Sequence, residues 1–190
     1  MFKKSRKVFK FALFLLLANL FLITSALPAL ASPDVVITTN PMIIQSSTWW
    51  CWAASATSIL RISGYSSLTQ SSFANTVQGN LNNVGRHAEQ VANDFYTHYG
   101  KSTTYALGTL SFSSIQTRIN ANKPIFSQVD WSTDGAHIVV ISGYDVTGQM
   151  LRIMDPASSL GGIWQYVSRT DFVSGGYGGN GTWTLYFYVN

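Results

Sequence analysis

The chain has 190 residues, of which 46% are hydrophobic and only 11% are charged, and its formal net charge is +4 at pH 7. Five of its twelve basic residues and none of its eight acidic residues lie within positions 1–31, so residues 32–190 carry seven basic and eight acidic groups, a net charge of about −1. The positive charge therefore belongs to the N-terminal segment, and it gives no reason to expect a nucleic acid or an acidic membrane as a partner.

Residues 1–31 have the pattern of a secretory signal peptide. Five Lys and Arg residues between positions 3 and 10 precede an apolar run at 11–23, and Ala29, Leu30 and Ala31 form a small-x-small cleavage sequence. We therefore expect a secreted, extracellular protein with no stable membrane association after cleavage. An uncleaved signal anchor stays open, because the apolar run approaches the length that spans a membrane.

The remaining residues, 32–190, are expected to form one domain with a single sizeable core, and we expect a monomer. Cys51 is the only cysteine, so the exported chain can form no internal disulfide. An odd cysteine of this kind suggests intermolecular pairing or a reactive thiol.

The stretch at residues 45–60 predicts a helix that begins at the cysteine. Apolar residues at 52, 53, 56, 59 and 60 share one helical face, and Gly64 stands where the helix would end. Ser47 and Thr48 are candidate N-caps. Backbone N–H groups at a helix N-terminus favour a thiolate at Cys51. The alternative is that Cys51 is a small buried hydrophobic residue.

The first half of the mature chain is predicted to be mainly helical and the second half to be a sheet. A short strand at 35–38 precedes further helices at 70–77, 86–99 and 111–120, and a Gly/Asn-rich break lies at 79–85. Alternating patterns predict strands at 124–129, 137–144, 150–154, 162–167 and 182–189. This order indicates an α+β fold with a cleft between the two layers.

The glycine-rich segment at 174–181, SGGYGGNG, lacks the Lys-Ser/Thr of a phosphate-binding loop. We interpret it as a flexible connection between strands, and it could alternatively border a substrate groove.

A cysteine nucleophile needs a base, and three histidines are available. His87 and His98 lie on a predicted helix of mixed polarity, where solvated or capping roles are expected. His137 follows Gly135 and Ala136 at the start of a predicted strand, at the rim of the sheet. From the residues alone, His137 could equally be a core histidine at a strand end.

The imidazole in turn needs an acceptor that fixes its tautomer and orientation. Asp145 is excluded because eight extended residues separate it from His137. A reversal near residues 146–148 would bring Asp155 back to the level of His137, although Asp155 and Pro156 could simply start a turn. Asp130 and Asp134 are the other candidates, and Asp134 is a minor competitor close to the histidine in sequence.

One spacing resembles the papain-like cysteine peptidases: Gln45 is followed, after five residues, by Cys51 and Trp52 at the start of a helix. The sequence WCWAAS, followed by Gln70, is similar to the compact bacterial branch that includes avirulence effector peptidases. The resemblance implies a papain-like fold with Cys51 as nucleophile, His137 as base and Asp155 as its orienting group. Gln45 would then donate to the oxyanion. The match departs from papain itself, which has Gly and a second Cys before the nucleophile.

The leading hypothesis is thus a cysteine peptidase that acts on a protein or peptide substrate without a cofactor. No metal-ligand spacing occurs in the sequence. Two alternatives remain: another acyl-transfer enzyme on the same scaffold (a transglutaminase, deamidase or cell-wall amidase), and a catalytically silent binding module.

Overall fold

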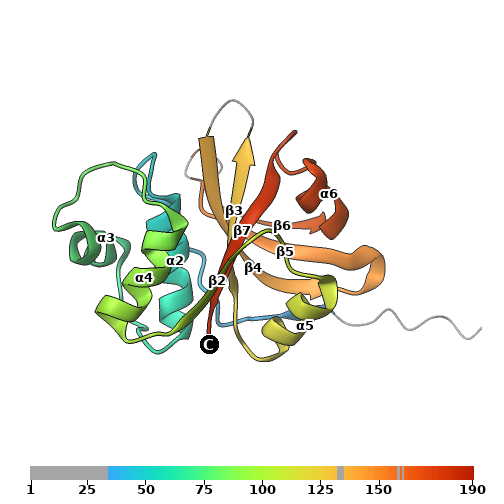
Figure 1. Ribbon diagram of the computed structural model, residues 1–190, viewed down its shortest axis with the longest axis horizontal. Helices are drawn as coiled ribbons and strands as arrows, with labels where there is room; N and C mark the ends of the chain where they lie inside the picture. The colour runs from blue at the N-terminus through green and yellow to red at the C-terminus, as the bar shows by residue number, and fades with distance from the viewer. Residues whose placement is uncertain (1–33, 132–134, 158, 160) are drawn as a thin grey trace, which may run out of the picture. The chain divides into compact units, whose positions relative to one another are not determined.

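The computed structural model describes residues 34–131, 135–157, 159 and 161–190. In this part of the chain, helices pack on an antiparallel sheet, which confirms the predicted α+β class (Figure 1). The segment interpreted as a signal peptide lies outside the described residues. Among the described helices, none is long and apolar enough to cross a membrane.

Three helices pack together on one side of the sheet, namely α2 (Cys51–Ile62), α3 (Gln70–Gln78) and α4 (Ala88–Tyr99) (Figure 1). All three were predicted, with ends that differ by at most two residues. Phe73 of α3 joins them, because its buried ring contacts Trp52, Phe95 and Tyr99. Both α3 and α4 end at a glycine in the left-handed conformation, which only glycine adopts without strain.

The main sheet has six strands in the spatial order β2 (Thr103–Leu107), β7 (Thr182–Val189), β3 (Ile125–Trp131), β4 (Gly135–Asp145), β5 (Met150–Asp155) and β6 (Ile163–Ser168). A seventh, short strand, β1 (Val35–Val36), pairs with β4. All pairings are antiparallel. The five strands predicted after residue 123 are confirmed.

Each face of the sheet has its own core, because side chains alternate along each strand. Ile138 and Val140 of β4 pack with α2, α3 and α4, whereas Val139 and Ile141 belong to a second cluster. The second cluster includes residues of α5 (Phe112–Asn120) and α6 (Arg169–Ser174). The two cores fix β4 from both sides.

Two elements were missed from the sequence. The prediction of a helical first half was wrong at β2, whose half-buried residues form a ladder with the distant β7. The helix α6 spans only six residues, too few to show a helical period. Its start is nevertheless marked by Ser168, whose side chain accepts a hydrogen bond from the Asp171 N–H.

Candidate active site

Cys51 is the first residue of α2, as predicted, but the expected N-cap was wrong. The cap position is Trp50, and no side chain in the described part of the chain caps the helix. The Trp50 N–H donates to the Ser47 carbonyl at 3.0 Å, so the chain enters the helix through a backbone turn that leaves the hydroxyls of Ser47 and Thr48 out of the cap. A helix end that no side chain caps keeps its N–H groups available to a negative charge near Cys51.

A one-residue bulge between β4 and β5 decides which side chains share a face of the sheet. On one side of the bulge, Asp145 pairs with Met150 and Gly143 pairs with Arg152. The register shifts by one residue between Gly143 and Ile141, and on the other side Val140 pairs with Met154. Continued by one residue, this register sets Asp155 opposite Val139, on the same face as His137. Without the bulge, Asp155 would fall opposite Val140 and point to the other face.

Gly143 is the residue at which this bulge meets β1. A Cβ on Gly143 would lie 2.8 Å from the Val35 carbonyl oxygen, closer than a methyl group can approach. The local sequence Ser142-Gly143 therefore allows both the bulge and the pairing of β1 with β4.

His137 and Asp155 meet as the sequence predicted. The ring Nε2 lies 2.7 Å from Asp155 Oδ1, and the ring is close enough to Cys51 for that side chain to affect its pKa. Burial by itself lowers the pKa of the ring. The hydrogen bond with Asp155, the nearby Cys51 side chain and the negative charges of the two groups outweigh burial and raise the pKa of His137 from 6.5 to about 9. The imidazole thus lies between the only thiol and a buried carboxylate.

The Asp155 carboxylate accepts two further hydrogen bonds. Its Oδ1 accepts from the Ala157 N–H at 2.9 Å, and its Oδ2 accepts from the Tyr177 hydroxyl at 2.6 Å. Burial raises the pKa of Asp155, but the hydrogen bonds and the charge of His137 hold the pKa below its ordinary value. The Ala157 contact is an Asx-type turn, so Asp155 both starts a turn and contacts the histidine.

Tyr177 is the contact that the sequence reasoning missed. It lies in the glycine-rich segment that was interpreted as a flexible connection, and its side chain is buried. The only available signal was a single aromatic residue among glycines, and nothing in that pattern indicates a partner 22 residues away.

Gln45 is held close to this site by its neighbours. Its N–H donates to the Pro156 carbonyl at 2.8 Å, next to Asp155. Gln70 accepts hydrogen bonds from the N–H and hydroxyl of Ser46 and donates to the Ile44 carbonyl, which fixes the chain on both sides of Gln45.

The amide of Gln45 is turned toward its own loop. Its Nε2 donates to the carbonyls of Ser47 and Thr48 at 3.1 and 2.8 Å, and its Oε1 is buried with no hydrogen-bond partner among the residues that the structure describes. The amide therefore has to exchange one of these two hydrogen bonds before it can donate to a substrate oxygen near Cys51.

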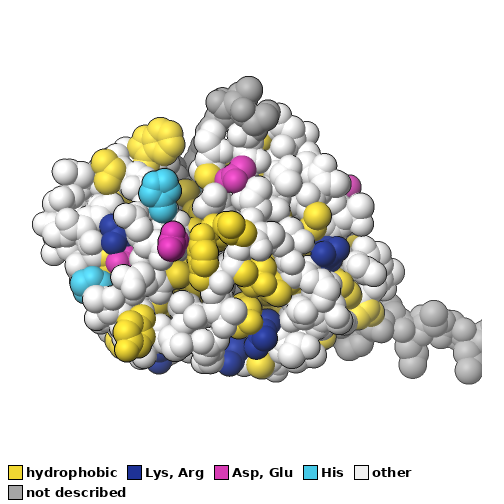
Figure 2. Space-filling view, in the orientation of Figure 1, with side chains coloured by type: hydrophobic (Ala, Val, Ile, Leu, Met, Phe, Trp, Pro, Cys, Tyr) yellow, Lys and Arg dark blue, Asp and Glu magenta, His cyan; other side chains and the backbone are white. Residues whose placement is uncertain are grey.

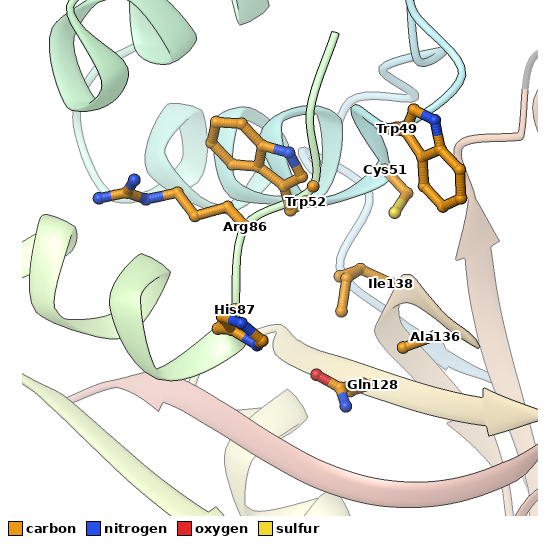
Figure 3. Close-up of a pocket in the computed structure, with 9 residues that line it drawn as sticks. Trp49, Cys51, Trp52, Arg86, His87, Gln128, Ala136 and Ile138 are labelled. Carbon is orange, nitrogen blue, oxygen red and sulfur yellow. The ribbon is translucent and has the colours of Figure 1, made fainter.

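A pocket of about 320 Å³ opens at Cys51 between the helices and the sheet (Figure 3). Trp49 is 55% exposed and lines the pocket beside the sulfur, while Ala136 and Ile138 line it from β4. His87 also lines it from the start of α4, where the Gln90 side chain accepts from the His87 N–H. On the face of the molecule shown in Figure 2, charged side chains are few and scattered.

The other candidate residues are engaged elsewhere or are exposed. Asp130 accepts from Gln128 and Thr184, and Asp145 accepts from the Thr147 N–H. His98 is exposed on α4. Asp134 lies outside the described residues. Among the residues that the structure describes, no group of three or more His, Cys, Asp or Glu side chains is arranged to hold a metal ion.

Comparison with known proteins gives a consistent result. The model of the Peptidase_C39 like family matches residues 37–181. The fold is similar to a putative C39-like peptidase from Bacillus anthracis, with a TM-score of 0.57 and 17% identity over 84% of this chain and 98% of that one. It is also similar to the peptidase domain of Streptococcus ComA, a bifunctional ABC transporter involved in quorum sensing. That match has a TM-score of 0.60 and 17% identity over 79% of this chain and 97% of the other. No curated protein matches the chain significantly.

The raised pKa of His137 can be tested by titrating its ring with NMR, with the resonance assigned through His137→Ala. We expect the ring to lose its proton near pH 9. Asp155→Asn should lower the midpoint, because it removes a negative charge and weakens the acceptor. Since the folded pKa exceeds the unfolded value of 6.5, the stability that the proton contributes is complete below pH 6.5 and is lost as the pH rises through 9. A midpoint near 6.5 in both proteins would contradict the assigned contacts.

Proposed function

Because the chain belongs to the C39-like family of cysteine peptidases, we propose that it hydrolyses peptide bonds through a triad of Cys51, His137 and Asp155. The observation that carries this proposal is the position of the His137 ring, between the Cys51 side chain and the buried Asp155 carboxylate. The resemblance to papain-like cysteine peptidases agrees with the family and the fold. The narrower similarity to the avirulence effector peptidases stays a prediction.

The first step follows from the charges around the ring. His137 takes the proton of the Cys51 thiol, and a ring whose pKa is about 9 keeps that proton at neutral pH. The imidazolium and the N-terminus of α2 both stabilise the thiolate, which is the attacking species. Asp155 accepts from Nε2 and so holds the ring in the tautomer that directs its other nitrogen at the sulfur.

The remaining steps transfer the acyl group to water. The sulfur bonds to the peptide carbonyl carbon, the C–N bond breaks, and the His137 proton goes to the departing amine. Water then attacks the thioester while His137 accepts its proton, and the acid is released with the thiolate restored. The backbone N–H of Cys51 and the amide of Gln45 would hold the oxyanion in both steps.

Hydrolysis of casein and of a fluorogenic peptide library by the mature protein tests the proposal. We expect Cys51→Ala to abolish turnover and His137→Ala to lower kcat at least 1,000-fold, on the order seen when triad members are removed. His98→Ala is the matched control, because His98 is exposed and outside the site. Transfer of glutamine acyl groups to amines, or cleavage of peptidoglycan amides in place of casein, would identify another acyl-transfer enzyme. No turnover of any of these would favour a binding module.

Gln45 is expected to contribute to kcat. Gln45→Ala should lower kcat about 100-fold with little change in KM, as for loss of one oxyanion donor. Ser46→Ala is the control, because it removes a hydrogen bond of 2.6 Å from the same loop without changing the Gln45 amide. If both variants lower kcat equally, Gln45 only holds the loop.

We also propose that the protein is exported, acts outside the cell as a monomer and takes a protein or peptide as substrate. Support comes from the basic and apolar pattern of residues 1–31 and its Ala29-Leu30-Ala31 sequence. Mass spectrometry of protein from the culture medium should find Ser32 at the N-terminus. A cell-bound chain that retains residues 1–31 would indicate a signal anchor.

A further inference from the structure

The glycine-rich loop, residues 174–181, is folded tightly against the sheet. Tyr177 and Gly181 form an antiparallel bridge, with hydrogen bonds of 3.3 Å from the Tyr177 N–H and 2.7 Å from the Gly181 N–H. This bridge closes a reversal with three residues, 178–180, between its ends. The loop thus has a defined conformation that its composition did not indicate.

Two of its glycines are required by close packing. A Cβ on Gly176 would lie 2.7 Å from the Cβ of Asp171 in α6. A Cβ on Gly181 would lie 2.6 Å from a methyl group of Val129 and 2.7 Å from the Tyr177 carbonyl oxygen. Because α6, β3 and the loop's own backbone already occupy these spaces, a larger residue at either position would displace the loop, and Tyr177 would move with it.

The Tyr177 side chain is buried and fixed on several sides. Its ring packs edge-on against Phe172 of α6, with centroids 5.3 Å apart, and lies near Trp131. Its hydroxyl donates to Asp155 Oδ2 at 2.6 Å and accepts from Gln165 Nε2 at 3.0 Å. The hydroxyl therefore has one donor and one acceptor partner, which leaves its proton directed at the carboxylate.

The Asp155 carboxylate would be free to rotate if only one oxygen were bound. Oδ1 faces His137 and the Ala157 N–H, whereas in the part of the chain that the structure describes Tyr177 is the side-chain donor to Oδ2. We propose that Tyr177, held by the glycine-rich loop and by Gln165, is a positioning residue that fixes Asp155 so that Oδ1 faces the His137 ring. This inference rests on the proposed function, since it concerns the geometry of the same triad.

The charges around Asp155 give the direction of the expected effect. The groups that act on the carboxylate are His137 of β4, the Tyr177 hydroxyl and the Ala157 N–H. Each of them stabilises the ionised form. Loss of the hydroxyl should therefore raise the pKa of Asp155 and make its negative charge less available to the imidazolium as the pH falls.

The test is Tyr177→Phe in the mature protein, with Tyr144→Phe as the matched control. Tyr144 is also buried and donates its hydroxyl to Asn120 Oδ1 at 2.9 Å, so its variant loses the same chemical group from the second core. We expect Tyr177→Phe to lower kcat about tenfold, as expected for a hydrogen bond to a charged group, with KM changed less than about twofold. The control variant Tyr144→Phe should change neither kcat nor KM by more than about twofold.

A second readout does not depend on turnover. The Asp155 carboxyl resonance in the 13C spectrum can be assigned with Asp155→Asn. Its titration midpoint should lie at higher pH in Tyr177→Phe than in the wild type, and it should be unchanged in Tyr144→Phe. If both kcat and this midpoint equal those of the wild type in a folded Tyr177→Phe protein, Tyr177 does not position Asp155. If the wild type cleaves no peptide but the midpoint shifts, the proposed function fails and the positioning contact stands.

Discussion

The hydrogen bond between His137 and Asp155 depends on the pairing register of β4 and β5. The bulge between Ile141 and Gly143 places both side chains on one face of the sheet, 18 residues apart in the chain and 2.7 Å apart at Nε2 and Oδ1. A shift of one residue would send Asp155 into the opposite core. Close approach of β1 at Gly143 and packing of both faces of β4 stabilise this register, so the fold positions the acceptor before any substrate binds.

The buried carboxylate sets the second constraint. A charged group that is 5% exposed needs hydrogen-bond donors to remain ionised, and Asp155 has three, from His137, Ala157 and Tyr177. These donors come from β4, from the turn after β5 and from the glycine-rich loop. Together they hold the pKa of Asp155 below its ordinary value, and the carboxylate in turn raises the pKa of the neighbouring His137 ring. The polar contacts of the site therefore support one another across elements that are distant in the chain.

Much of this arrangement could be predicted from the sequence, because periodicity reports which face of an element is buried. The helix that begins at Cys51 and the strands that carry His137 and Asp155 all follow from such patterns. Contacts that form only in three dimensions could not be predicted: β2 pairs with a strand some 80 residues later, and Tyr177 reaches Asp155 only through the folded loop. The cap at Trp50 was missed because the chain enters α2 through a backbone hydrogen bond, from the Trp50 N–H to the Ser47 carbonyl, and not through a capping side chain that a sequence pattern would mark.

In the proposed mechanism His137, oriented by Asp155, activates the sulfur of Cys51. The rate of covalent modification of Cys51 by a thiol-directed epoxide at neutral pH, followed by mass spectrometry, measures that activation without any knowledge of the substrate. We expect rapid adduct formation on Cys51 in the wild type and a much slower reaction in a folded His137→Ala protein, because the imidazolium that stabilises the thiolate is lost. Equal rates in the two proteins, at the level of an ordinary thiol, would show that His137 does not activate Cys51.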